Sequence, residues 1–382
     1  MACGDDDASS VNGSFSKVAR ECTEVVYASS PFGNAAAVDR YSMDFVVPAG
    51  AQGFLISAYH RDSTTTLSSL VAPSGRTYDL TLGTLGQYHP AALANLAGIP
   101  VDVDRMMIPP SPAEADMFEI GRWELRGDST GSKFCVSLAL ATGAGTTVDL
   151  TVYLVGIDGL AAVNAPRHSE LQDVFDRVTD IFGEAGMHID RSDIRYIDLD
   201  DMESVVRFSI LRGFEDFQEL LRLSTTSSSR SNDALRLNVF LIRGFSGNLP
   251  SGLLGVASGV PGAAGVHGTS DSGIVFGVEA FLGVETEGTA ETAAFDGNRF
   301  LGDVMAHEIG HYLGLFHTTE IRGGNDPLDD TPGCALATVT QYEQLQDCPD
   351  LDNLMFPIAV PEVGVELTAD QIETMRVNPL VR

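Results

Sequence analysis

The hydrophobic pattern divides the chain into a first part of short strands and a second part where helices and strands alternate. Residues 22–158 carry short β-branched and aromatic runs separated by Gly, Pro, Asp and Ser, which is typical of strands. The runs lie at 25–27, 40–47, 54–59, 68–71, 118–120, 121–125, 134–138 and 148–154. We predict an all-β sandwich from this spacing. Residues 1–21 before it are small, polar and acidic, which predicts a flexible tether.

The second part, residues 159–382, is predicted to be an α+β domain. Residues 168–186 have a helical spacing of apolar positions, and 214–223 predicts a shorter helix. Strands are expected at 194–199, 235–242 and 273–277, and residues 254–277 are the best candidate for an edge strand near a site. The boundary is predicted at residues 156–159, where a strand-like run ends and a helical one follows. Thr368, with Gln371 three residues later, predicts the start of a last helix.

One stretch in this part carries a candidate metal site. Residues 307–317 read H-E-x-x-H-x-x-G-x-x-H. His307 and His311 are four residues apart, so on a helix they share one face. Gly314 is suited to end that helix, because glycine adopts left-handed backbone angles at little cost, and the chain can then return His317 to the same point.

This donor set predicts a catalytic Zn²⁺ site. Three neutral imidazoles and a water make an open tetrahedral site, and Glu308 is placed to hold the water rather than the metal. The alternative is an amphipathic helix with incidental histidines. Three of the eight histidines in the chain fall in this window, which argues against that alternative.

Short motifs after the histidines resemble the metzincin zinc metalloproteases and, among them, the pappalysin family. Met355 lies 38 residues after His317, where metzincins have a methionine turn below the metal. The resemblance spans about residues 300–378. It rests on H-T, D-T-P, two cysteines, N-x-M and L-T-x-x-Q-x-x-x-M, at 317–318, 330–332, 334 and 348, 353–355 and 367–375. Pro357 stands where the family often has a tyrosine.

The resemblance implies a multidomain protein that ends in an α/β/α metzincin-type catalytic domain. Its activity would be that of a zinc-dependent endopeptidase acting on proteins or peptides. Glu308 would activate a zinc-bound water and pass its proton to the leaving amine, above Met355. The alternative is a non-catalytic surface lipoprotein or binding module that retains a zinc site. Residues 121–126 also resemble a strand of jelly-roll domains appended to secreted proteases, so the sandwich is predicted to be jelly-roll-like, as a binding or a stabilising module.

The cysteines indicate an oxidising compartment outside the cytoplasm. Cys22 and Cys135 bracket the predicted sandwich, and Cys334 and Cys348 bracket a short loop, so we predict two disulfides. Cys3 is left over. Followed by Gly and an acidic, Ser-rich segment, it is typical of the mature end of a bacterial lipoprotein and predicts lipidation, although it could also be incidental. A secreted or cell-surface bacterial protein is expected.

The net charge of the chain indicates which classes of partner are disfavoured. The formal net charge of −30 disfavours nucleic acid, whose phosphates would repel the chain. The sequence contains no apolar run of about 18 residues, so no transmembrane segment is predicted. We also expect the protein to be a monomer. Asp326, Asp329 and Asp330 gather near Glu320 as hard oxygen ligands that suit Ca²⁺. A solvated acidic loop is the equal alternative.

Overall fold

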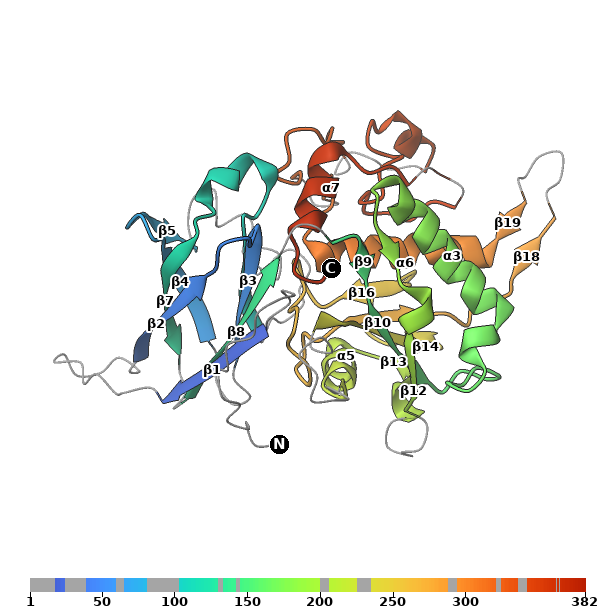
Figure 1. Ribbon diagram of the computed structural model, residues 1–382. Helices are drawn as coiled ribbons and strands as arrows, with labels where there is room; N and C mark the ends of the chain where they lie inside the picture. The colour runs from blue at the N-terminus through green and yellow to red at the C-terminus, as the bar shows by residue number, and fades with distance from the viewer. Residues whose placement is uncertain are drawn as a thin grey trace.

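The computed structural model has a mixed α+β architecture with several sheets and few helices (Figure 1). It describes residues 18–24, 39–59, 65–80, 103–129, 133–141, 145–199, 206–224, 235–287, 294–320, 324–335, 342–361, 363 and 365–382. Two groups of sheets lie side by side. An antiparallel sandwich is on the left of Figure 1, and a mixed sheet covered by helices is on the right.

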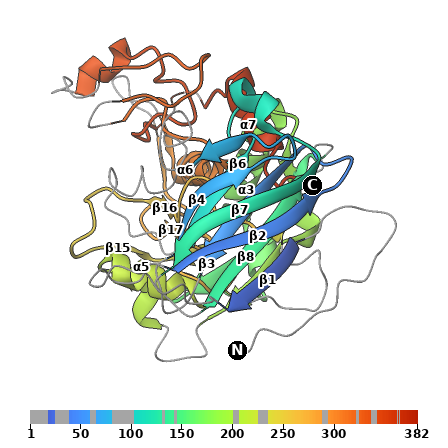
Figure 2. The ribbon, with the colours of Figure 1, turned by 90° about the vertical axis from the view of Figure 1, so that its left-hand side faces the viewer.

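The sandwich consists of two four-stranded antiparallel sheets. The inner sheet has the order β1 (Val18–Glu24), β8 (Lys133–Ala141), β3 (Gly53–Tyr59), β6 (Val103–Ile108). The outer sheet has the order β2 (Asp39–Val47), β7 (Gly121–Ser129), β4 (Thr65–Val71), β5 (Thr77–Asp79). Figure 2 shows the two sheets from the side of the sandwich, which is the left-hand side of Figure 1.

Aromatic side chains fill the space between the two sheets. Trp123 of β7 is fully buried and meets Phe54 of β3 edge-on, with ring centroids 5.2 Å apart. The indole N–H donates to the Glu119 carbonyl over 2.9 Å, so its one polar group is satisfied. This packing agrees with the predicted sandwich.

The second part is built on a five-stranded sheet. Its order is β12 (Arg195–Asp198), β10 (Leu150–Val155), β14 (Leu237–Ile242), β17 (Ile274–Gly277), β16 (Gly255–Ala257). The first four strands are parallel, and β16 runs antiparallel at the edge. The central strands are buried and mostly apolar because both faces of the sheet are covered.

Helices cover the two faces of this sheet and make three layers. Helices α3 (Ser169–Glu184) and α6 (Gly297–Leu313) share a core with Val152 and Leu154 of β10. Helix α5 (Phe214–Leu221) packs on the other face, against Tyr153. The period-two alternation of β10 therefore divides its side chains between the two cores.

Short elements complete the fold. Helix α7 (Ala369–Arg376) begins with the predicted capping box of Thr368 and Gln371. Short strands of two residues also pair. Strand β9 (Thr147–Val148) pairs with β11 (His188–Ile189), β13 (Ile210–Leu211) with β15 (Gly244–Phe245), and β18 (Glu285–Thr286) with β19 (Phe295–Asp296). Short 3-10 helices lie at 112–117, 165–167, 191–193, 207–209 and 342–347.

Three sequence expectations differ from the structure. The run at 148–154 was assigned to the sandwich, but β10 pairs with β12 and β14 of the second part. The end of the predicted tether, from Val18, forms β1 and pairs with β8. No strand forms at 118–120, while β6 was not predicted. The run at 25–27 lies outside the described residues.

The inner sheet of the sandwich packs directly on the second part. Leu55, Met107 and Ala139 from this sheet belong to the core of α3 and α6. In return, Val260 and Phe316 join the sandwich core. Each part therefore contributes apolar side chains to the core of the other.

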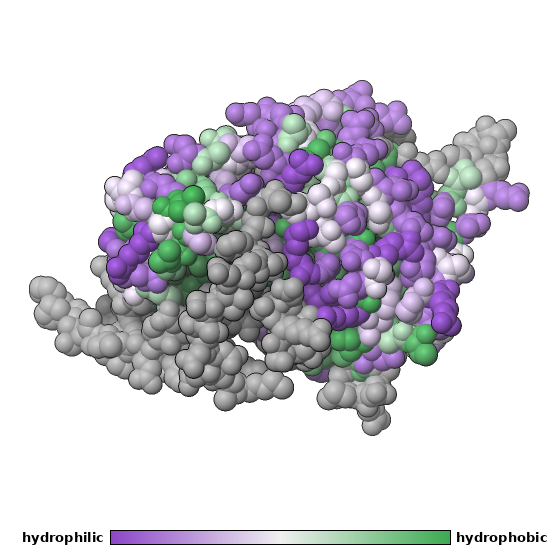
Figure 3. Space-filling model, viewed as in Figure 1, coloured by the Kyte–Doolittle hydropathy of each residue, from purple (hydrophilic) through white to green (hydrophobic). Residues whose placement is uncertain are grey.

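The outer surface over α3 is mainly hydrophilic (Figure 3). Asp173, Asp176, Asp180 and Glu184 are exposed along this helix, at the spacing of one helical face. No helix in the described residues is long and apolar enough to cross a membrane.

Candidate metal centre

Helix α6 holds two of the three motif histidines. It begins after Asp296, whose carboxylate accepts from the N–H groups of Asn298 and Arg299, and this cap satisfies two amides that have no partner within the helix. It ends at Gly314, which has φ of 117°, as the motif predicts. The turn at Gly314 brings His317 back towards the helix.

The three motif histidines converge on one point. The ring centroids of His307 and His311 are 4.6 Å apart, those of His311 and His317 are 4.6 Å apart, and those of His307 and His317 are 5.3 Å apart. One ligand nitrogen from each ring lies within 4.8 Å of the others. The Nε2 atoms of His311 and His317 are 3.1 Å apart.

The opposite nitrogen of each ring faces an oxygen. Nδ1 of His307 is 2.7 Å from the Leu354 carbonyl, and Nδ1 of His311 is 2.7 Å from the Leu315 carbonyl. Nδ1 of His317 lies 3.3 Å from a Glu320 carboxylate oxygen. Oxygen acceptors at Nδ1 favour the tautomer that carries its proton there, so the Nε2 lone pairs point at one another.

Burial keeps two of these rings neutral. It lowers the pKa of His307 to about 3, with a smaller contribution from His317. The pKa of His311 is also well below its usual value, first because of burial and then because of His317 and His307. Neutral imidazoles are the form that binds metal ions.

The donor set fits a tetrahedral zinc ion. With Zn–N bonds of about 2.0–2.1 Å, two tetrahedral ligand nitrogens stand about 3.3 Å apart, close to the observed His311–His317 separation. Facing lone pairs repel each other unless a cation or proton lies between them. The other convergent group among the described residues, Cys334 with Cys348 and Asp350, contains a disulfide and offers no thiolates.

Glu308 lies on the same helix, beside the edge strand β16. An added Cβ on Gly255 would stand 2.7 Å from Cγ of Glu308, so the carboxylate arm lies against that glycine. The Ala257 N–H donates to the carboxylate. Burial nevertheless raises the pKa of Glu308 to about 8, because desolvation outweighs this hydrogen bond. A carboxyl with such a pKa can hold or release a proton near neutral pH.

Met355 lies beneath the helix at the histidines. It is fully buried, and its sulfur would be 2.7 Å from a Cβ placed on Gly310. The Met355 carbonyl accepts from the Thr318 N–H over 3.1 Å, and the neighbouring Leu354 carbonyl accepts from His307. The turn at Met355 therefore fixes both segments that carry the histidines.

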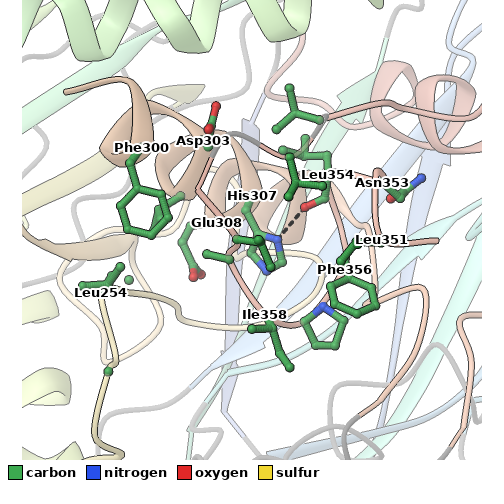
Figure 4. A pocket seen from close by; sticks show the side chains of 18 of the residues that line it. Leu254, Phe300, Asp303, His307, Glu308, Leu351, Asn353, Leu354, Phe356 and Ile358 are labelled. Atoms are coloured by element: carbon green, nitrogen blue, oxygen red, sulfur yellow. Dashed lines mark hydrogen bonds between the residues drawn. The ribbon is translucent and has the colours of Figure 1, made fainter. Parts of the chain in front are cut away.

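A cavity of about 170 Å³ opens beside His307 and Glu308 (Figure 4). Its lining comes from α6, from residues 252–255 at the start of β16, and from residues 351–365 on both sides of Met355. The apolar members are Leu253, Leu254, Phe300, Val304, Leu351, Leu354, Phe356, Pro357, Ile358, Ala359, Val360, Val363 and Val365. Asp303 also lines it but is engaged by Arg177 of α3 over 2.6 Å.

The predicted calcium ligands do not gather at one point. Asp330 accepts from Thr368 Oγ1 and the Asp370 N–H at the start of α7, over 2.8 and 3.0 Å, while Asp329 is exposed. Asp326 is partly buried, which raises its pKa to about 7. None of the three belongs to the convergent groups found among the described residues. Calcium therefore stays a prediction.

One of the two predicted disulfides is present in the described residues. Cys334 and Cys348 are bonded, with Cα atoms 5.2 Å apart. Cys22 and Cys135 are directly opposite in the register of β1 and β8, but their side chains lie outside the description, so that disulfide stays a prediction. Cys3 and its lipidation also lie outside the described residues.

Several residues that shape the site could not be predicted from the sequence. Ala257 acts through its backbone N–H, which leaves no trace in residue type. Leu315 and Leu354 likewise act through their backbone carbonyls, which the residue type does not indicate. Gly310 did carry a signal, since a glycine inside a helix usually marks close packing. His267, in the loop after β16, pairs its Nδ1 with the Asn238 amide over 2.8 Å and lies outside the convergent groups of the described residues.

Comparisons with known proteins give little further guidance. No protein-family model matches the chain, and no curated protein sequence matches it. Among solved structures the chain is similar to the crystal structure of metalloproteinase-II from Bacteroides fragilis, with 16% sequence identity and a TM-score of 0.31. The match covers 61% of this chain and 53% of that one. A likeness this weak assigns neither a fold nor an activity.

Proposed function

We propose that this chain is a zinc-dependent endopeptidase of metzincin type, similar to the pappalysins, with His307, His311 and His317 as zinc ligands. The observation that carries the proposal is the geometry of the three rings. Their ligand nitrogens converge, while each Nδ1 faces an oxygen. A buried carboxyl with a raised pKa lies on the same helix.

Glu308 is the proton carrier of the proposed reaction. When bound, Zn²⁺ would lower the pKa of a coordinated water and polarise the scissile carbonyl. Glu308 takes a proton from the attacking water as the water oxygen bonds to the carbonyl carbon. It then delivers that proton to the amide nitrogen as the C–N bond breaks, so one group serves both steps. Its position beside β16 holds it on the cleft side of α6.

The edge strand offers backbone groups to an extended substrate. Leu254 and Ser258 make hydrogen bonds to Gly277 and Gly273. In an antiparallel pair such residues alternate with ones whose N–H and C=O point away. Gly255 therefore directs its N–H and C=O, and Ala257 its C=O, toward the free edge, where we place a peptide strand.

The proposal also covers the cellular location, the substrates and the oligomeric state. The Cys334–Cys348 disulfide supports an oxidising compartment, so a secreted or cell-surface protein is proposed. In the chain-entropy model, closing a loop of this size contributes about 3 kcal/mol. We propose proteins or peptides as substrates and a monomer as the active form.

Substituting His317 tests the metal set. His317→Ala leaves two imidazoles, and we expect zinc content to fall sharply while the fold persists. His188→Ala is the control, since His188 is an exposed histidine outside the cluster. Metal analysis after dialysis against sub-micromolar zinc measures the effect. Full zinc occupancy in His317→Ala would remove that residue from the ligand set.

The cavity predicts the side chain preferred beside the scissile bond. Its apolar lining should favour Leu, Ile, Met or Phe over charged residues. Ile358 is 36% exposed at this wall, so Ile358→Glu adds a charge without emptying the core. We expect the ratio of apolar to basic preference to fall about tenfold or more.

A peptide library measures this preference on both sides of each cleaved bond. Ile120→Glu is the matched control, because Ile120 is 54% exposed on the sandwich. A preference unchanged in Ile358→Glu, or changed equally in both variants, would mean that the cavity does not select the substrate.

A further inference from the structure

A buried arginine of the sandwich reaches into the second part. Arg105, on strand β6, has 0% of its side chain exposed, and its Nη1 is 3.0 Å from an Asp271 carboxylate oxygen. Asp271 is itself 2% exposed. The pair thus joins residues 166 positions apart in sequence, across the contact between the two parts.

The Arg105 guanidinium also binds backbone carbonyls of the same loop. Its Nε donates to the Pro261 carbonyl over 2.6 Å, and its Nη2 donates to the Ser258 carbonyl over 2.7 Å. An added Cβ on Gly259 would lie 1.8 Å from Nη2, so a glycine is needed where the loop closes around the guanidinium. Residues 258–273, the clamped loop, are therefore shaped around one side chain.

The clamped loop begins where the edge strand ends. Ser258 follows Ala257, whose N–H donates to the Glu308 carboxylate. The loop also contacts α6 one residue beyond a candidate ligand, since the Gly262 N–H donates to the Tyr312 carbonyl over 2.8 Å. A Cβ on Gly262 would meet the Tyr312 ring at 2.2 Å. Arg105 and α6 thus hold the loop from two sides.

The form of this contact suits positioning better than simple stabilisation. A buried ion pair is weak support for stability, because desolvating both charges offsets their attraction and apolar replacements often serve as well. Arginine instead offers five donors in a rigid, planar arrangement. Here that arrangement sets Ser258, Pro261 and Asp271 relative to β6.

We propose that Arg105 is a positioning residue, through which the sandwich fixes the clamped loop, the end of β16 and the Ala257 N–H that orients Glu308. The sandwich is then part of the construction of the active cleft. The consequence for turnover rests on the function proposed above, whereas the effect on the loop does not.

Arg105→Lys in the full chain tests this proposal. Lysine keeps a positive charge near Asp271 but cannot donate to both carbonyls in the same plane. We expect backbone hydrogen exchange across residues 254–264 to accelerate at least tenfold, with residues 297–313 unchanged. For the zinc-loaded protein we expect kcat to fall at least tenfold with KM within about twofold, at equal zinc content.

Two further variants separate positioning from stability. Leu70→Ala empties part of the sandwich core on the outer sheet, whereas Arg105 lies on the inner sheet, so it should lower Tm without changing exchange at 254–264 or kcat. Ser258→Ala removes the hydroxyl that donates to the Asp271 carbonyl over 2.7 Å, and should act as Arg105→Lys does but less strongly. It also serves if Arg105→Lys does not fold.

The outcomes distinguish the two proposals. Faster exchange in Arg105→Lys with no peptide cleavage by the wild type would support positioning and reject the endopeptidase. Unchanged exchange in both loop variants would reject positioning, whatever the wild type cleaves. Parallel losses of kcat in Leu70→Ala and Arg105→Lys would also reject it, since general destabilisation would then suffice.

Discussion

Glu308→Gln should bind zinc as the wild type does and lose nearly all peptide cleavage. The three histidines are untouched, and the glutamine carbonyl can still accept from the Ala257 N–H, so the site keeps its shape. The amide can neither take a proton from water nor return one to the leaving amine. Loss of general acid–base catalysis alone costs about 10²–10⁴-fold, and here one residue serves both steps.

Turnover of a fluorogenic peptide, with zinc content measured on the same samples, checks this result. Glu184→Gln on the exposed end of α3 is the matched control. Wild-type turnover in Glu308→Gln would rule out Glu308 as the proton carrier.

Metal-free protein gives an independent measure of the same carboxyl. Burial raises the pKa of Glu308 to about 8, so the folded state holds a proton that the unfolded state releases at lower pH. Wild-type stability should therefore fall, relative to Glu308→Gln, as the pH rises from about 5 to 8. A difference in Tm that does not grow over this range would show that the carboxyl is not desolvated.

A fragment that begins at residue 160 should fail to fold. It lacks β10, which pairs with β12 on one side and with β14 on the other. All six residues of β10 are buried. At about 1.5–3 kcal/mol for each large apolar side chain, their loss is on the order of 10 kcal/mol, comparable to the whole stability of a domain.

A fragment that begins at residue 146 is the matched control. It retains β9 and β10 and so can rebuild the sheet, but Asp271 loses its partner Arg105. We expect cooperative unfolding for the longer fragment, faster hydrogen exchange in residues 258–273 and little turnover. Circular dichroism and thermal unfolding compare the two. A cooperatively folded 160–382 fragment would restore the boundary first predicted.

The strands of the sandwich were predictable where apolar runs stood between turn residues, but β6 was not. It carries Asp104 and Arg105 between apolar residues, and Arg105 is buried through Asp271, far away in sequence. The hydrophobic pattern around Arg105 cannot reveal a partner that lies far away in sequence. Strand β10 had the right pattern, yet alternation does not reveal which sheet a strand joins.

The candidate site was predictable because its chemistry resides in side chains at fixed helical spacing. His307, Glu308 and His311 follow from one helix, and Gly314 signals the turn that returns His317. The groups that orient them are backbone atoms, such as the carbonyl of Leu354, and these are set by tertiary packing. For the acidic loop, composition predicts calcium, which stays a prediction, but it does not reveal that Asp330 accepts from Thr368 and Asp370 at the start of α7.

Digestion of a proteome-derived peptide library tests the central claim most directly. The wild type would be compared as purified, after chelation, after zinc is restored, and alongside Glu308→Gln. We predict cleavage that disappears with the chelator, returns with zinc and is absent in the variant. Zinc-loaded, folded wild type that cleaves no peptide in the library would contradict the account.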